Sequence, residues 1–171
     1  MKIVYENPWF HVLKQNQYHF IRETGSDNGA VIIAMLKNTF IFVKVFRQAH
    51  QNYILELPRG YGVINESSTM TAIRELQEET GYTVALEHLK FVGKIKPNSS
   101  ILCSNIPVYF AKIYERAKQD INLMDSETNE VLLLDQKEVF ERIANGEISD
   151  GISLSDRMLY FTKFECEKLD K

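Results

Sequence analysis

Short runs rich in hydrophobic, β-branched and aromatic residues, separated by polar breaks, fill the first third of the chain, a pattern typical of β-strands. Three such runs precede residue 24 and are separated at 7–8 and 15–17. A polar, glycine-bearing segment, 24–29, then leads to two runs rich in β-branched and aromatic residues, 31–36 and 40–46, which resemble a hairpin. The pattern predicts a small N-terminal antiparallel sheet over residues 1–28, followed by a larger sheet.

The remainder of the chain mixes helical and extended patterns. Further strands are predicted at 53–58, 83–95, 106–114 and 131–134, a polar loop at 121–130, and helices at 136–145 and, as a rough apolar stripe that includes Met158, at 155–169. Another helix is predicted to begin at Ser67–Thr69 and to end at Thr80, before Gly81. We therefore predict an α/β fold in which a mixed central sheet is flanked by helices, with a main domain over 29–171.

Three glutamates lie together on the first of these helices. Helical spacing places Met70, Ile73, Leu76 and Thr80 on the face that packs against the body, and it places Glu75, Glu78 and Glu79 on the opposite side. The carboxylates are therefore expected to face a groove or solvent. Like charges at this spacing cost a few tenths of a kcal/mol per pair, roughly, and Arg74 offsets part of that cost. A solvated acidic face is one interpretation, and a cation site is the other.

The residues around these glutamates favour the cation site. The fixed positions are Gly60, Glu66, Arg74, Glu75, Glu78, Glu79, Gly81 and Tyr82. This spacing resembles the signature of the Nudix hydrolases, although Tyr82 stands where a bulky aliphatic residue is usual. The resemblance implies an α/β/α sandwich from residue 29 onward. It also implies hydrolysis of a nucleoside diphosphate linked to another group, by attack of water on a pyrophosphate phosphorus.

The resemblance also implies roles for the residues of the signature. Glu75 and Glu79 are expected to be the central ligands of Mg²⁺ or Mn²⁺, with Glu78 as a further or bridging ligand. These cations prefer hard carboxylate oxygens, and they neutralise charge on the phosphates. The carbonyl of Arg59 is expected to bind metal as well. The positions expected to orient the ligands are Gly60, through a tight turn, and Glu66 and Arg74, through salt bridges.

Flanking residues resemble the ADP-ribose pyrophosphatase branch of the family. Arg47 and Glu56 lie in a strand pattern that leads through Pro58 to the signature, and Pro97 lies 16 residues after Gly81. We expect substrate contacts from these residues, from Arg59 and, by position, from Ser104. A surface role for Arg47 and a simple strand-ending role for Pro97 remain alternatives.

For three features, namely the substrate, the residue that stacks on a base and the catalytic base, the resemblance to this branch leaves alternatives open. The branch usually carries a glycine and a glutamate where this chain has residues near Ser100 and Ser104, so GDP-mannose and other nucleoside-diphosphate sugars remain alternatives to ADP-ribose. Trp9 or Phe10 is a candidate for stacking on a base, with core packing as the alternative. The catalytic base is expected in the 121–130 loop, and its candidates are Asp125, Glu127 and Glu130, Glu127 also being a candidate metal ligand.

Composition narrows the class of partner. The chain has 171 residues and a net charge of −3, which gives no electrostatic reason to expect nucleic acid or an anionic membrane. Its two cysteines, Cys103 and Cys166, have no paired spacing, and with the absence of a signal-like N-terminus this predicts a cytoplasmic protein. The resemblance implies a homodimer. Other functions left open are a nucleotide-sanitising or RNA-decapping Nudix enzyme and a non-catalytic ligand-binding module.

Overall fold

The computed structural model describes residues 1–114 and 128–165, and within these residues the chain forms two β-sheets, three α-helices and one short 3-10 helix. The strands are β1 (Lys2–Glu6), β2 (Phe10–Gln15), β3 (Tyr18–Glu23), β4 (Ala30–Leu36), β5 (Thr39–Arg47), β6 (Asn52–Glu56), β7 (Arg59–Gly60), β8 (Lys90–Ile95), β9 (Ile106–Ile113) and β10 (Thr128–Leu134). The helices are α1 (Ser68–Thr80), η1 (Leu86–His88), α2 (Gln136–Ala144) and α3 (Gly151–Phe164).

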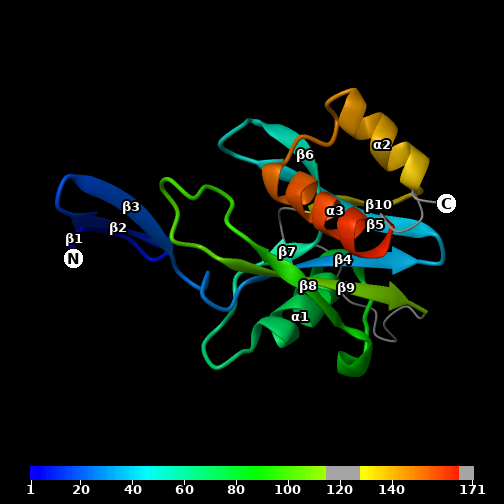
Figure 1. Cartoon of the computed structure of the whole chain (residues 1–171), viewed down its shortest axis with the longest axis horizontal. Coiled ribbons are helices and arrows are strands. Elements are labelled where there is room, and N and C mark those ends of the chain that lie inside the picture. The colour runs from blue at the N-terminus through cyan, green and yellow to red at the C-terminus, as the bar shows by residue number, and fades with distance from the viewer. Residues whose placement is uncertain (115–127, 166–171) are drawn as a thin grey trace.

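The main sheet is mixed, and helices cover both of its faces. Its strand order is β10-β5-β4-β9-β8, with β6 beside β5 and β7 beside β4. Strands β4 and β9 run parallel, whereas the other pairs are antiparallel. Helix α1 lies on one face, and α2 and α3 lie on the other (Figure 1). The predicted α/β fold, with a mixed sheet and a small antiparallel sheet, is therefore confirmed.

Strand β4 shows why the sheet needs helices on both sides. It is a continuous apolar run because both of its faces are buried, as is typical of a strand in the middle of a covered sheet. Val31 and Ile33 belong to the core beneath α2 and α3, whereas Ile32 and Ala34 belong to the core beneath α1. Alternate side chains therefore join two separate cores.

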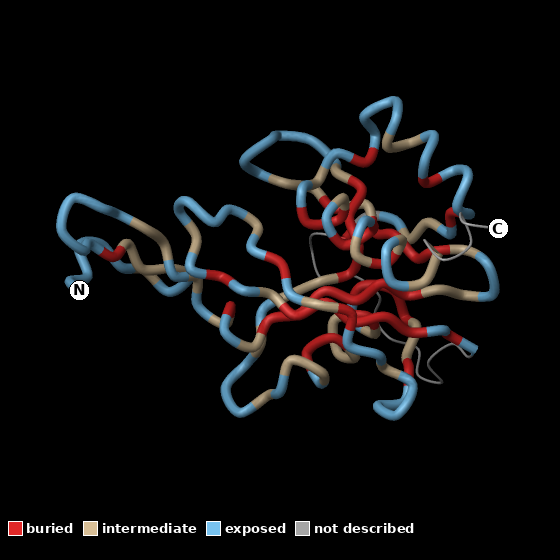
Figure 2. The backbone as a smooth tube through the Cα atoms, viewed as in Figure 1, coloured by how far each residue is buried: buried red, intermediate tan, exposed pale blue. Residues whose placement is uncertain are grey.

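The N-terminal sheet, β1-β2-β3, extends away from the main body (Figure 1) and is mostly exposed (Figure 2). Leu13 is its buried apolar residue. Strand β3 joins the turn after β8 through two backbone hydrogen bonds: Ile21 N–H donates to the Ile101 carbonyl at 2.7 Å, and Cys103 N–H donates to the Ile21 carbonyl at 2.8 Å. The small sheet is thus attached beside the loop that precedes β9.

Some sequence predictions need correction. The run 83–95 contains η1 before the strand begins at Lys90, because only its second half pairs with β9. Strand β10 begins at Thr128, inside the expected polar loop, and α3 begins at Gly151 rather than at 155. Met158 was expected on the packed face of the last helix, yet it is exposed. No helix in the described ranges is long and apolar enough to cross a membrane.

Candidate active site

Helix α1 begins and ends at the residues that its sequence predicts. The Ser67 side chain accepts a hydrogen bond from Met70 N–H at 3.3 Å, which satisfies one of the unpaired donors of the first turn. Gly81 follows the helix with a left-handed φ of 72°, which favours glycine. These two caps fix the register of the helix and therefore the positions of its glutamates.

The guanidinium of Arg74 joins the carboxylates of the box, the name used here for residues 60–82. Its Nε and Nη2 each donate to Glu66 at 3.0 Å, and its Nη1 donates to Glu75 at 2.7 Å and to Glu78 at 2.8 Å. Nη2 also donates to the Tyr61 carbonyl at 2.8 Å. One cation thus holds three mutually repelling carboxylates and ties the loop before the helix to the helix itself.

This network shifts the titration of Glu66. The hydrogen bonds from Arg74 lower the pKa of Glu66 to about 2; burial opposes the shift, and hydrogen bonds from Thr71 and the Val63 backbone reinforce it. The same contact with Glu66 raises the pKa of Arg74 above its usual range. The pair is therefore charged at every pH at which the protein is expected to work.

Two of the four box acids, Glu75 and Glu79, are less exposed than helical spacing predicts. Glu79 is only 7% exposed and accepts a hydrogen bond from Arg59 N–H at 3.1 Å. The Glu75 side chain is 12% exposed and lies against Gly60, where an added Cβ would stand 2.1 Å from the Glu75 Cδ. Met70, expected on the packed face, is instead 49% exposed. The expected outward orientation is wrong for Glu75 and Glu79 because β7 packs over this side of α1.

The reason for Gly60 also differs from the prediction. We expected a tight turn, but Gly60 lies in strand β7 and its φ is not left-handed. A side chain is excluded at this position because the Glu75 carboxylate occupies the space that a Cβ would need. The glycine therefore permits close contact between the strand and a box carboxylate.

A second charged cluster centres on Glu56, which is only 2% exposed. Its carboxylate accepts hydrogen bonds from Arg47, at 2.8 and 2.6 Å, and from Arg59, at 2.9 and 2.6 Å. Burial acts to raise the pKa of Glu56, but the two arginines outweigh it and hold this pKa below its usual value. Three of the predicted substrate-binding residues are therefore brought together in one place.

Arg59 connects this cluster to the box. Its side chain contacts Glu56 and lies 3.5 Å from a carboxylate oxygen of Asp150, while its backbone N–H binds Glu79. Asp150 caps α3 by accepting from the Ser153 N–H and hydroxyl, both at 2.8 Å, and Ser153 Oγ accepts from Leu57 N–H at 3.0 Å. The start of α3 thereby fixes the strand that carries Arg59.

Helix α3 also buries two ionisable residues, Asp156 and Arg157, that were not among the predicted site residues. Asp156 is fully buried, and its carboxylate oxygens have no hydrogen-bond partner in the described part of the chain. Burial raises the pKa of Asp156 to about 8, with the charge of Arg59 opposing the shift and that of Asp150 adding to it. The Arg157 guanidinium stacks 3.8 Å from the centre of the Phe40 ring. The only sequence signal is a pair of charges inside an apolar helical stripe.

Three further predicted residues, Pro97, Ser104 and Glu130, lie on other elements. Pro97 is in the turn after β8, and Ser104 donates to the carboxylate of Glu23. Glu130, on β10, lies 3.7 Å from the Lys44 ammonium. The candidate bases Asp125 and Glu127 fall outside the described residues, as does Cys166.

Two cavities lie outside the box. One, of about 450 Å³, is lined by residues of the β2–β3 hairpin and of the 99–103 turn. The other, of about 570 Å³, lies between the β5–β6 hairpin and the α2–α3 connection. Neither is lined by a box residue.

The box matches a divalent cation in donor chemistry and in charge. Glu66, Glu75, Glu78 and Glu79 supply hard carboxylate oxygens, and three of them share the single guanidinium of Arg74. In the described residues, however, no three Asp, Glu, His or Cys side chains are grouped closely enough to hold a metal ion. The donors fit Mg²⁺ or Mn²⁺, while their present positions are set by hydrogen bonds to Arg74 and to the Arg59 backbone.

Arg74→Lys is expected to lower the free energy of unfolding in a pH-dependent way. Lysine cannot form the two parallel bonds to Glu66, so the pKa of Glu66 in the folded variant should rise toward its ordinary value of 4.5. A lowered carboxylate pKa stabilises the protein above the unfolded pKa, and this stabilisation disappears as the pH falls through the folded value. Denaturant unfolding at several pH values should show the deficit of the variant shrinking from pH 4.5 toward 2. A deficit independent of pH would contradict the assignment.

No family model matches the chain. Among characterised proteins, it is 27% identical to a methanol dehydrogenase activator of Bacillus methanolicus, over 71% of this chain and 65% of the relative, so it spans just under two thirds of that relative. It is 27% identical to an ADP-ribose pyrophosphatase of Bacillus subtilis, over 76% of this chain and 70% of the relative. It is 29% identical to a GDP-mannose pyrophosphatase of Klebsiella pneumoniae, over 88% of this chain and 83% of the relative.

A solved structure described as an ADP compounds hydrolase has the same fold, with a TM-score of 0.76 over 97% of this chain and 92% of that chain, at 17% identity. The resemblance to the Nudix hydrolases predicted from residues 60–82 is confirmed by these comparisons. Within the class, two of these relatives are pyrophosphatases, one named for ADP-ribose and the other for GDP-mannose.

Proposed function

We propose that this protein hydrolyses the pyrophosphate bond of a nucleoside diphosphate linked to a sugar, with ADP-ribose as the first candidate, giving AMP and ribose 5-phosphate. The observation that carries the proposal is the group of box carboxylates around Arg74, beside the strand that bears Arg59. Such a group is suited to a substrate whose phosphates need a cation for neutralisation, because carboxylates alone would repel them.

The proposed cofactor is Mg²⁺ or Mn²⁺. Glu75, Glu78 and Glu79 would hold it together with the carbonyl of Arg59, and Glu127 is a further proposed ligand. When bound, the cation would neutralise the phosphates and lower the pKa of a coordinated water. Glu75 and Glu79 are the stronger candidates in this set because both are largely buried beside β7. Glu78, half exposed on the same helix, is proposed to complete the site.

The chain's own residues orient these ligands. Arg74 fixes Glu66 and Glu75 by hydrogen bonds, as side chains around metal ligands commonly do. Arg47 and Arg59, held by Glu56, are proposed to bind a substrate phosphate or ribose, since both guanidiniums are partly exposed and Arg59 is joined to Glu79. Asp125 and Glu127 remain the proposed bases, and Glu130 is the alternative.

GDP-mannose is the second candidate substrate. A GDP-mannose pyrophosphatase aligns over 88% of this chain, and Ser104 stands where the ADP-ribose branch usually carries a glutamate. Contacts from Pro97 and Ser104, stacking by Trp9 or Phe10, and a homodimer formed through the N-terminal sheet remain predictions. The net charge of −3 favours a small-molecule substrate over nucleic acid or membrane.

A substrate panel tests the proposal. Purified protein is incubated with ADP-ribose, GDP-mannose, other nucleoside-diphosphate sugars, a modified nucleoside triphosphate and capped RNA, each with Mg²⁺ or Mn²⁺. Products are resolved by chromatography. We expect the highest kcat/KM for a nucleoside-diphosphate sugar, and no turnover with a chelator present. Turnover of the triphosphate or of capped RNA alone would overturn the substrate class. Binding by calorimetry without any product would favour a ligand-binding module.

A further inference from the structure

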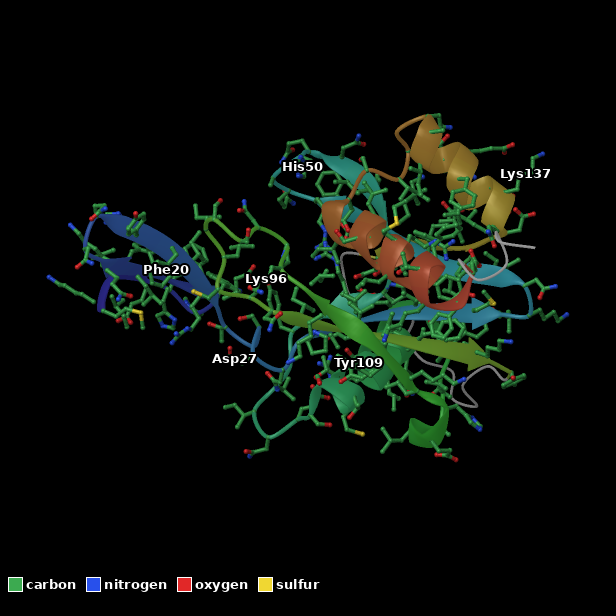
Figure 3. All side chains as sticks on the ribbon, in the orientation of Figure 1. Phe20, Asp27, His50, Lys96, Tyr109 and Lys137 are labelled. Carbon is green, nitrogen blue, oxygen red and sulfur yellow. The ribbon has the colours of Figure 1, made fainter. Side chains whose placement is uncertain are left out.

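The segment between the N-terminal sheet and the main sheet, residues 23–29, lies along the loop at the start of the box, residues 60–66. We call these the linker and the box loop. Gly62 N–H donates to the Gly25 carbonyl at 3.0 Å, which joins the two backbones. Asp27, in the linker, lies at the junction between the small sheet and the body (Figure 3). Two segments about 35 residues apart in sequence are therefore neighbours in space.

Asn28 makes the most specific contact between them. Its Nδ2 donates to the carbonyl of Val63 at 2.8 Å and to that of Glu66 at 2.9 Å. One side-chain amide thus bridges both ends of the turn that leads to the box acid Glu66. Because the amide supplies two donors from one atom, no other uncharged side chain of similar size repeats this arrangement.

Two glycines, Gly25 and Gly62, leave the space that this contact between the linker and the box loop needs. A Cβ at residue 62 would stand 2.1 Å from the Asn28 Cγ, so the amide fills the space that a side chain at 62 would need. A Cβ at Gly25 would stand 2.6 Å from the Gly62 carbonyl oxygen, and Gly25 also has a left-handed φ of 76°. Gly62 has no such φ, so its lack of a side chain is explained by Asn28 alone.

Glu23, at the start of the linker, is bound both to the box loop and to the segment before β9. The Glu23 carboxylate accepts from the Tyr61 hydroxyl at 2.7 Å and from the Ser104 hydroxyl. Burial first, and then the Glu23 carboxylate, raise the pKa of Tyr61 to about 12, so the phenol remains a donor. The linker is thereby fixed to the box loop at both of its ends, at Glu23 and at Asn28.

The box loop is in turn bound to the network of carboxylates. Tyr61 offers its carbonyl to Arg74, and Glu66 binds Arg74 through both carboxylate oxygens. Arg74 then holds Glu75, one of the proposed metal ligands. A continuous set of hydrogen bonds therefore runs from Asn28 through Glu66 and Arg74 to the proposed cation site.

We propose that Asn28 is a positioning residue for this cation site: by holding the box loop, it sets the geometry in which Glu66 and Arg74 present the metal-binding carboxylates. This proposal rests on the proposed metal-dependent function. It adds a contribution from outside the box, because the linker that supplies Asn28 comes directly after the N-terminal sheet. Asn28 acts through the backbone carbonyls of Val63 and Glu66.

A double-mutant cycle tests the proposal with four proteins: wild type, Asn28→Ala, Gly62→Ala and the double variant. Mn²⁺ affinity is measured by electron paramagnetic resonance of the free ion, without substrate. Asn28→Ala should weaken Mn²⁺ binding about tenfold, as loss of groups that orient metal ligands commonly does. Gly62→Ala should weaken it at least as much, because its methyl group meets the Asn28 side chain. In the Asn28→Ala background that clash is gone, so Gly62→Ala should add little.

Kinetics and a control variant separate positioning from general stability. In Asn28→Ala, kcat and the Mn²⁺ concentration for half-maximal rate should change more than KM, whereas Asn38→Ala, in the exposed β4–β5 turn, should match wild type. Thermal unfolding is recorded for each variant. Mn²⁺ affinity of Asn28→Ala within about twofold of wild type, or additive effects in the cycle, would overturn the proposal even if all variants are less stable.

The experiments distinguish failure of the proposed function from failure of the proposed role of Asn28. A wild-type protein that binds Mn²⁺ but hydrolyses no member of the substrate panel would reject the proposed function, while the Mn²⁺ measurements on the variants would still decide the role of Asn28. A wild-type protein that binds no Mn²⁺ would overturn both.

Discussion

Glu79→Gln is expected to reduce kcat by about three orders of magnitude, which corresponds to about 4 kcal/mol of lost transition-state stabilisation. The substitution keeps the size of the side chain and can retain the hydrogen bond from Arg59 N–H. It removes a negative charge that is only 7% exposed and that we propose as a metal ligand. The measurement is steady-state hydrolysis of the best substrate of the panel with saturating Mg²⁺.

The matched control is Glu141→Gln. Glu141 is an exposed helical glutamate on α2, 3.5 Å from Lys137, so its neutralisation should leave kcat near the wild-type value. Equal rates for wild type and Glu79→Gln would reject the assignment of the cation site. A loss of activity in Glu141→Gln of similar size would show instead that the assay responds to general destabilisation.

Glu56→Gln is expected to lower the free energy of unfolding by about 3 kcal/mol at neutral pH, the lower end of the cost of breaking a buried ion pair from one side. Glu56 accepts hydrogen bonds from both Arg47 and Arg59, so an amide in its place would leave two partly buried cations without their shared negative charge. Urea unfolding monitored by circular dichroism gives the value.

The pH dependence of the free energy of unfolding gives an independent test of the role of Glu56. Its pKa is held below the ordinary value, so its stabilisation is complete above the unfolded pKa and is lost as the pH falls through the folded one. The difference between wild type and Glu56→Gln should therefore decrease at low pH. A loss below about 1 kcal/mol at neutral pH, which is typical of exposed pairs, would mean that the cluster contributes little to stability.

The sequence predicted structure best where an element is determined by residues close to it along the chain. Caps, glycine spacing and apolar periodicity gave the bounds of α1 to within a residue, because each depends on neighbours along the helix. The box acids were found by their spacing. Their burial could not be predicted, since it depends on β7, a two-residue strand that packs over Glu75 and Glu79 through contacts that helical geometry does not contain.

Residues that act across long sequence separations were missed. Glu23 and Asn28 lie in a segment that reads only as a polar turn, and their partners lie between 35 and 81 residues away. The available signal was the repeated glycine in both segments, which indicates close backbone approach without saying to what. Asp150 was missed for the same reason, because its contact with Arg59 joins two segments that are far apart in the sequence.

The chain has a single tryptophan, Trp9, and it is 72% exposed in the N-terminal sheet. Its carbonyl accepts the Thr24 N–H at 2.8 Å, beside the start of the linker. Tryptophan emission from this protein, excited selectively over its eight tyrosines, is therefore a local signal from the edge of the molecule, whereas circular dichroism is dominated by the main sheet and the helices. If the two optical methods report the same unfolding transition, the small sheet unfolds together with the body. If the tryptophan transition comes at lower denaturant, the small sheet unfolds before the body.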